Sequence, residues 1–127
     1  GDSRILAAVC KRLEHSNVDV RTTALDALEA VVEKGDSTSV DVVSKYLEHF
    51  SLEVRLLAGE ALAKIVEKGD DHAIRAVCKR LEHRNDDVRC AAVTALPKVA
   101  IKGDQRALST LSKLLQQRGH PAVRFEA

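Results

Sequence analysis

The stretch GDSRILAAVCKRLEHSNVDVRTTALDALEAVVEK, Gly1 to Lys34, returns along the chain with changes and decides its architecture. It recurs as GDSTSVDVVSKYLEHFSLEVRLLAGEALAKIVEK from Gly35 and as GDDHAIRAVCKRLEHRNDDVRCAAVTALPKVAIK from Gly69. A fourth copy, GDQRALSTLSKLLQQRGHPAVRFEA, opens at Gly103 and is incomplete. Because Gly-Asp recurs every 34 residues, the sequence predicts a repeat protein with copies 1–34, 35–68, 69–102 and a partial copy 103–127.

Composition indicates a folded protein and excludes several classes. The 127 residues are 45% apolar and 31% charged, which is typical of a globular chain and not of a disordered one. The net charge of +1 provides no sequence-wide excess of Lys and Arg for nucleic acid. No apolar run approaches the length of a membrane span, and no signal peptide pattern opens the chain. We therefore expect one repeat domain, 1–127, of a cytoplasmic or nuclear protein, and a fragment of a longer array.

The three cysteines, Cys10, Cys78 and Cys90, are expected to be reduced. Cys10 and Cys78 occupy the same position two copies apart, so stacked helix layers would hold them about 20 Å from each other. A disulfide requires Cα atoms within about 7 Å. The distance between Cys10 and Cys78 therefore favours reduced, structural thiols in a reducing compartment.

Each copy predicts two helices joined by a short polar turn. In the first copy the first helix is expected over about 3–15, because four apolar residues share one helical face: Leu6, Val9, Cys10 and Leu13. The second helix is expected over about 19–33, with a buried stripe of Val20, Ala24, Ala27, Leu28 and Val31. The predicted N-caps of the second helices are Asn17, Ser51 and Asn85. The glycines that open each later copy are expected to end the preceding helix: Gly35, Gly69 and Gly103.

A second motif recurs at the start of each second helix. It reads (D/E)-V-R-x-x-A-x-x-A-L and begins at Asp19, Glu53 and Asp87. On these residues the chain resembles HEAT repeats, particularly the short variety similar to that of phycobilisome-lyase-like proteins. The resemblance implies an all-α fold, an α-α superhelix (HEAT-like solenoid) whose second helices line the concave side. It also implies a non-catalytic scaffold for a protein or peptide partner. Tetratricopeptide repeats share the period of 34, but their Trp, Gly and Tyr signals are absent.

No residue pattern in the sequence predicts catalysis, a cofactor or a metal site. His15, His49 and His83 recur one copy, or about 10 Å, apart, whereas zinc needs its ligands about 2 Å from a single ion. HEAT-like deoxyhypusine hydroxylases bind iron through His-Glu dipeptides, and this sequence has none. A ladder of arginines, each just inside a second helix, is expected to pair with neighbouring acids: Arg21, Arg55, Arg89 and Arg124. We therefore predict that the chain is not an enzyme.

The outward face of the second helices is the predicted binding site. At 100° per residue, the positions opposite the core carry mostly acids and some apolar groups. The candidate partner-binding residues, on the face that the resemblance makes concave, are Thr22, Asp26, Glu29, Glu33, Leu52, Leu56, Glu60, Glu67, Cys90 and Thr94. We expect this acidic groove, with its apolar spots at Leu52 and Leu56, to receive a basic or amphipathic segment.

Four alternatives stay open. The first helices carry nine basic residues, which could bind nucleic acid although the total charge argues against it: Arg4, Lys11, Arg12, Lys45, Arg75, Lys79, Arg80, Arg106 and Lys113. A bilin-lyase-like enzyme component is an alternative by analogy only. The chain could also serve as a spacer within an array. The fourth alternative is self-association through the incomplete fourth copy. Without a complete partner helix, the apolar face of three leucines there is poorly covered: Leu108, Leu111 and Leu115.

Overall fold

A computed structural model of the chain describes residues 3–116, and between these limits it contains helices and turns but no strand. The first helices of the copies are α1 (Ser3–Lys11), α3 (Ser37–Ser44), α5 (Asp71–Leu81) and α7 (Gln105–Gln116). Short 3₁₀ turns, η1 (Arg12–Glu14) and η2 (Lys45–Glu48), extend α1 and α3. The second helices are α2 (Val18–Val31), α4 (Leu52–Ile65) and α6 (Asp86–Val99). The predicted all-α solenoid is confirmed.

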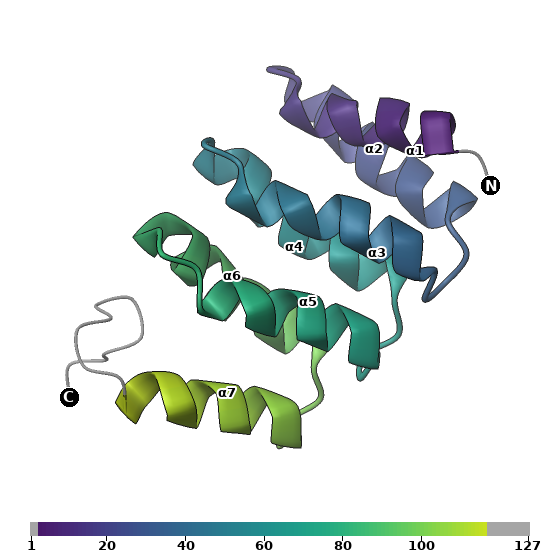
Figure 1. Cartoon of the computed structure of the whole chain (residues 1–127). Coiled ribbons are helices and arrows are strands. Elements are labelled where there is room, and N and C mark those ends of the chain that lie inside the picture. The colour runs from purple at the N-terminus through teal and green to yellow at the C-terminus, as the bar shows by residue number, and fades with distance from the viewer. Residues whose placement is uncertain (1–2, 117–127) are drawn as a thin grey trace.

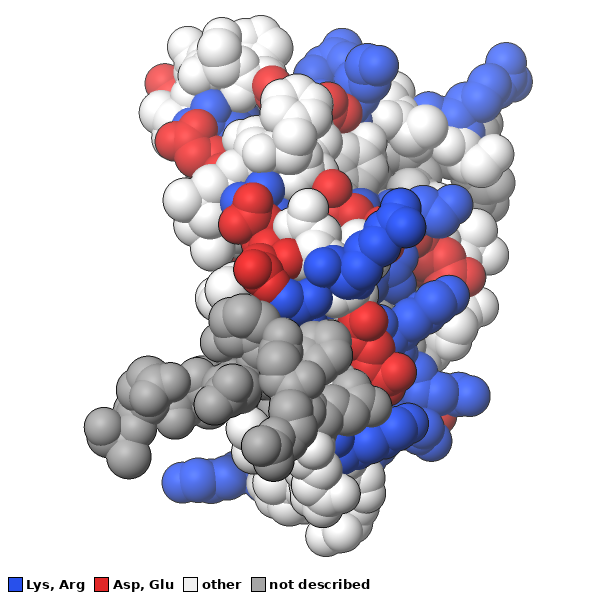
Figure 2. Space-filling view, turned by 60° about the vertical axis from the view of Figure 1, so that its left-hand side comes forward, with Lys and Arg blue, Asp and Glu red and all other residues white. Residues whose placement is uncertain are grey.

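The helices form two parallel rows. In Figure 1 the first helices α3, α5 and α7 succeed one another in front, and α4 and α6 lie behind them. Packing follows this order, because α2 contacts α4, α4 contacts α6, α3 contacts α5 and α5 contacts α7. Charged side chains are spread over the face of the stack that Figure 2 shows. The predictions for the second helix of the fourth copy, including Arg124, lie outside the described residues.

No helix between residues 3 and 116 combines the length and the apolar character that crossing a membrane requires.

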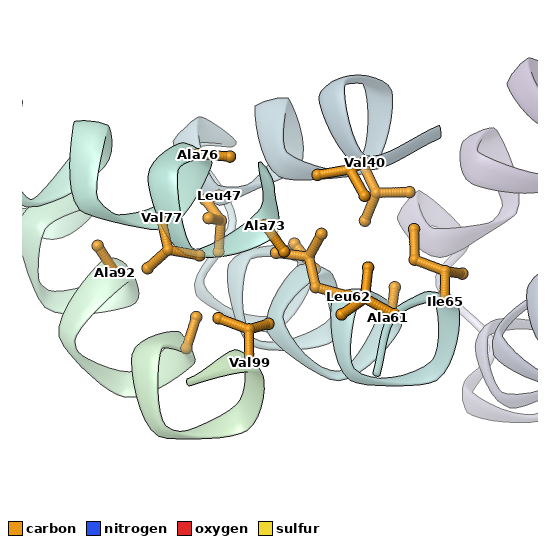
Figure 3. Close-up of a cluster of buried hydrophobic side chains, with 14 of the residues drawn as sticks. Val40, Leu47, Ala61, Leu62, Ile65, Ala73, Ala76, Val77, Ala92 and Val99 are labelled. Carbon is orange, nitrogen blue, oxygen red and sulfur yellow. The ribbon is translucent and has the colours of Figure 1, made fainter. Parts of the chain in front are cut away.

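The core runs through the stack as a column of equivalent side chains. We count repeat positions from the glycine of each Gly-Asp, so that Leu13, Leu47 and Leu81 share position 13; all three are fully buried. Small residues such as Ala61 and Ala92 let neighbouring helices approach closely (Figure 3). Each copy thus covers the apolar face of the next, as expected for hairpins that cannot bury their own face.

One member of the predicted stripe is exposed. Val31 is 55% exposed, although its equivalents at position 31, Ile65 and Val99, are 1% and 0% exposed. Ile65 lies on α4, which packs on α2 of the preceding copy. Within the described residues no copy precedes the first one, and Val31 therefore faces outward.

The N-caps are confirmed and the predicted helix ends are not. The side chains of Asn17, Ser51 and Asn85 each accept a backbone N–H of the second helix that follows. The prediction that Gly35 ends the preceding helix is wrong, because α2 already ends at Val31. Gly35 instead has a φ of +83° in the turn that leads to the next copy. Its N–H donates to the last carbonyl of α4, at Ile65, and the N–H of Gly69 donates to the last carbonyl of α6, at Val99, so each bond joins the start of a copy to the end of its second helix.

Candidate interaction surface on the second helices

The arginine ladder holds the turn inside each copy. Nη1 of Arg21, Arg55 and Arg89 donates to the backbone carbonyl at repeat position 15, over distances of 2.8, 2.8 and 2.6 Å. Arg55 and Arg89 are 8% and 4% exposed. Arg21 also lies 3.9 Å from Glu53 of the next copy, and Arg89 pairs with Asp86 of its own. The predicted pairing with acids is thus found for Arg21, and for Arg89 with a different acid, whereas the acceptor that the three arginines share is a backbone carbonyl.

The recurring histidines are also part of the scaffold. Nδ1 of His15, His49 and His83 accepts the backbone N–H two residues ahead, at 3.0 to 3.1 Å. Nε2 of His49 is 3.1 Å from Glu14 and Nε2 of His83 is 3.4 Å from Glu48, in each case in the preceding copy. These contacts link successive copies. Among residues 3–116 no group of three or more His, Cys, Asp and Glu side chains is placed to hold a metal ion.

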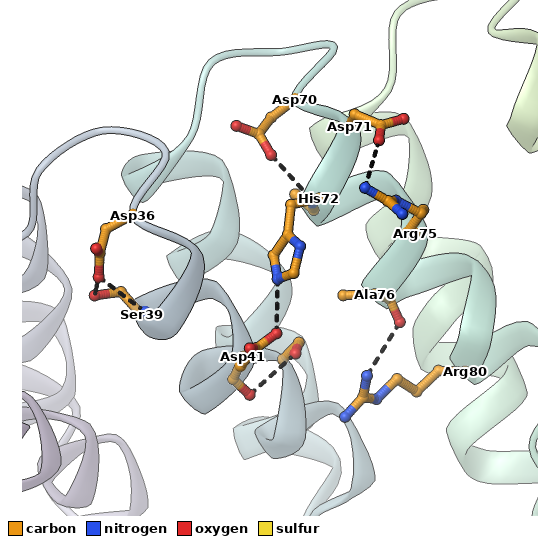
Figure 4. A network of polar contacts seen from close by, with 11 residues as sticks. Asp36, Ser39, Asp41, Asp70, Asp71, His72, Arg75, Ala76 and Arg80 are labelled. Carbon is orange, nitrogen blue, oxygen red and sulfur yellow. Dashed lines mark hydrogen bonds and ion pairs between the residues drawn. The ribbon is translucent and has the colours of Figure 1, made fainter.

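The first helices are joined by a network of polar contacts (Figure 4). His72 Nε2 lies 2.8 Å from Asp41, and Arg75 lies 2.9 Å from Asp71. Arg80, which the sequence places in an exposed basic stripe, is only 9% exposed and binds Glu48 at 3.0 Å. The prediction is therefore wrong for this residue. Lys and Arg side chains follow one another down the right-hand side of Figure 2, which is the side of the first helices.

The cap of α3 belongs to the same network. Asp36 accepts hydrogen bonds from the side chain and the backbone N–H of Ser39, at 2.6 and 3.0 Å. These bonds stabilise the charged carboxylate and lower the pKa of Asp36. Asp36 thus acts as an N-cap of the repeat and not as an acid for chemistry.

Two of the three free thiols are neutral core residues. Burial raises the pKa of Cys10 to about 11, because a thiolate would lose its hydration. Burial raises the pKa of Cys78 as well. Only Cys90, on α6, is exposed. Neither buried thiol is therefore an activated nucleophile.

All ten predicted partner-binding residues are exposed in the structure. They lie on the three second helices or in the turns that directly follow α2 and α4. We call the surface formed by these ten residues the second-helix face. Lys64 Nζ lies 3.5 Å from Glu29 and neutralises part of its charge, whereas Asp26, Glu60 and Glu67 keep exposed carboxylates.

Sequence reasoning missed the most exposed aromatic side chain of this region. Phe50 is 91% exposed in the turn before α4, and its ring stacks on the imidazole of His49 with centroids 4.3 Å apart. Leu52, two residues on, is 60% exposed, and Leu56 is 41% exposed. Phe50 occupies repeat position 16, where the other copies have the polar residues Ser16 and Arg84. A comparison of this position across the copies could therefore have singled out Phe50. Large apolar groups held in water in this way are common anchors of interfaces.

Comparison with family models decides the classification. Residues 6–83 match the model of HEAT repeats, which is more than half of the chain. The chain belongs to the HEAT repeat family. No curated protein gives a significant match. HEAT repeats generally mediate protein–protein interaction.

Proposed function

We propose that this HEAT repeat chain is a protein-interaction module whose second-helix face binds a basic, amphipathic segment of a partner. One observation carries the proposal. Exposed acids and exposed large apolar side chains occur together on and beside α4, whereas the recurring Arg and His residues of the motif are engaged inside the stack. The face therefore offers charge and apolar area to the same ligand.

The spacing of the apolar groups suits a helical ligand. Leu52 and Leu56 are one helical turn apart on α4, and Phe50 precedes them in the turn. Asp26 on α2 and Glu60 on α4 present carboxylates from neighbouring helices. A ligand helix with Leu at i, i+3 and i+4 and Lys on its flanks would cover the apolar groups and meet the acids. Charge complementarity would then select basic over acidic helices.

A pair of model peptides tests this proposal. The probes are an 18-residue helix of Leu and Lys, and the same helix with Glu in place of Lys, each titrated into the labelled protein. We expect saturable binding of the Lys peptide and no binding of the Glu peptide. Glu60→Lys should weaken the Lys peptide about fivefold, because the change from attraction to repulsion at an exposed pair costs about 1 kcal/mol in total. Phe50→Ser, which installs the residue of the first copy, should weaken it about tenfold.

Glu82→Lys is the matched control, because it changes the net charge equally on an exposed residue at the end of α5, a first helix. It should leave the affinity for the Lys peptide within about twofold. Equal losses in Glu60→Lys and Glu82→Lys would show that net charge alone acts, and would refute the proposed face. Failure of both peptides to bind the natural sequence would refute the ligand class.

A second candidate function is nucleic-acid binding by the first helices. The observation in its favour is that repeat position 11 is an exposed lysine in every copy: Lys11, Lys45, Lys79 and Lys113. A 20-base-pair DNA duplex should then bind with an affinity that falls steeply as salt rises, and replacing all four lysines by Gln should abolish binding. An absence of binding at low salt would exclude this function.

A further inference from the structure

One exposed residue is the same in all four copies although the fold does not require it. Over repeat positions 1–16 the copies share only Gly at position 1, Asp at position 2, Lys at position 11 and Leu at position 13. In the third copy Gly69 has a φ of +98°, Asp70 caps α5 and Leu81 is fully buried, so these three shared residues serve the fold. The shared lysine is exposed in every copy: Lys11, Lys45, Lys79 and Lys113.

These four lysines, which we call the lysine row, are not engaged by neighbouring side chains. Within residues 3–116 none of them forms an ion pair or a side-chain hydrogen bond. Acids of the same helices are engaged, since Glu14 lies 3.1 Å from His49 and Glu48 lies 3.0 Å from Arg80. The ammonium groups of the lysine row are therefore open to an anionic ligand.

The spacing of the lysine row follows from the packing of the first helices. Because α1 contacts α3, α3 contacts α5 and α5 contacts α7, position 11 recurs at the distance between packed helices, about 8–10 Å. A polyproline II chain has three residues per turn and rises about 3.1 Å per residue. Every third side chain of such a chain thus points the same way, at intervals of about 9 Å. A carboxylate at every third residue would meet one lysine in each copy.

A row of acids beside the lysines favours a narrow ligand. Repeat position 14, about one helical turn beyond the lysine, is Glu14, Glu48 and Glu82 in the first three copies. Acidic and basic side chains lie next to one another on this side of the stack in Figure 2. A DNA duplex carries phosphates on both strands, about one charge per 1.7 Å of its axis, and would meet the acids as well as the lysines. A single extended peptide can contact the lysines alone.

We propose that the lysine row binds an extended acidic segment of a partner protein, in which Asp or Glu recurs at every third residue. Each carboxylate pairs with the lysine of one copy, so that the segment crosses the first helices. Charge complementarity sets the class of the ligand, and the distance between copies sets its pattern. This site goes beyond the second-helix face, uses none of its residues and does not depend on the function proposed for it.

Two labelled peptides of equal composition and charge test the spacing. The spaced peptide is Glu-Pro-Pro three times followed by Glu, and its prolines favour the polyproline II form. The clustered peptide has the same four Glu in succession, followed by the six Pro. In fluorescence anisotropy titrations at low ionic strength we expect saturable binding of the spaced peptide, at least about fivefold tighter than that of the clustered peptide. Added salt should weaken the binding, because it screens exposed charges.

Paired variants locate the binding site. Lys45→Gln combined with Lys79→Gln should weaken the spaced peptide about tenfold, because two of four ion pairs are lost. The matched control, Lys34→Gln combined with Lys68→Gln, removes the same charge from exposed turn residues after the second helices and should stay within about twofold. All four side chains are exposed, so both double variants should keep their circular dichroism spectrum and unfolding midpoint.

Each of four results would overturn the proposal. The first is the absence of saturable binding at low ionic strength, and the second is equal affinity for the two peptides, which would show that charge alone acts. The third is an equal loss of affinity in the two double variants. The fourth is a DNA duplex that binds more tightly than the spaced peptide and loses affinity in Lys45→Gln with Lys79→Gln, which would assign the lysine row to nucleic acid.

Discussion

Repeat position 13 offers a direct test of how the copies support one another. Leu47 and Leu115 are the same residue at the same position of a first helix, but Leu47 is fully buried and Leu115 is 51% exposed. We predict that Leu47→Ala destabilises the protein by about 3 kcal/mol and Leu115→Ala by about 1 kcal/mol.

The two magnitudes follow from burial. Removing the buried atoms of Leu47 loses their whole transfer free energy and leaves a closed cavity, and such substitutions cost about 2–5 kcal/mol. Leu115 already has half of its surface in water, so only about half of a transfer term of roughly 1.5–3 kcal/mol is at stake, and no closed cavity forms. The difference between the variants should therefore be about 2 kcal/mol.

Urea unfolding followed by circular dichroism at 222 nm measures both variants against the natural sequence. The slopes of the transitions should agree, so that the midpoints can be compared. Equal losses of stability in the two variants would refute the idea that a helix pair depends on its neighbour for cover. A larger loss in Leu115→Ala would refute it as well.

Three further predictions concern the turns and the thiols. Gly69→Ala should lower the free energy of unfolding by about 1–2 kcal/mol, because its φ of +98° strains any residue with a Cβ; an unchanged urea midpoint would contradict this. Arg55→Leu should cost about 1–3 kcal/mol by removing the donor to the turn, whereas the exposed Arg84→Leu should change stability by less than about 0.5 kcal/mol. At pH 8 a thiol reagent should modify Cys90 at once and Cys10 only on unfolding, because burial keeps the pKa of Cys10 at about 11; rapid labelling of two or more thiols in the folded protein would contradict this.

Much of the fold could be predicted because local signals agree with the period. The N-caps Asn17, Ser51 and Asn85 precede apolar stripes in every copy, and the structure confirms each of them. The exposure of Leu108 and Leu115 agrees with the sequence prediction that these leucines of the fourth copy lack full cover. The exposure of Val31 could not be predicted from its stripe, because burial depends on which neighbouring copy is present. Only the three-dimensional structure shows which apolar side chains have a neighbouring copy packed against them.

The roles of the polar residues were harder to predict. Sequence shows that Arg55 has acidic neighbours, but it does not show that a backbone carbonyl lies 2.8 Å from the guanidinium. For the same reason the link between His49 and Glu14 of the preceding copy was not foreseen. Helical periodicity did place the ten candidate residues on an exposed face, yet it ignored Phe50, because a turn residue belongs to no helical stripe. The binding role of that face stays a prediction.

The most direct test of the central claim is an NMR titration of the ¹⁵N-labelled protein with the Leu/Lys helix. The account predicts that the amide shifts which change most belong to the second-helix face and its neighbour, around Asp26, Phe50, Leu56 and Glu60. Changes confined to the first helices, around Lys45 and Lys79, or no change at all, would contradict it.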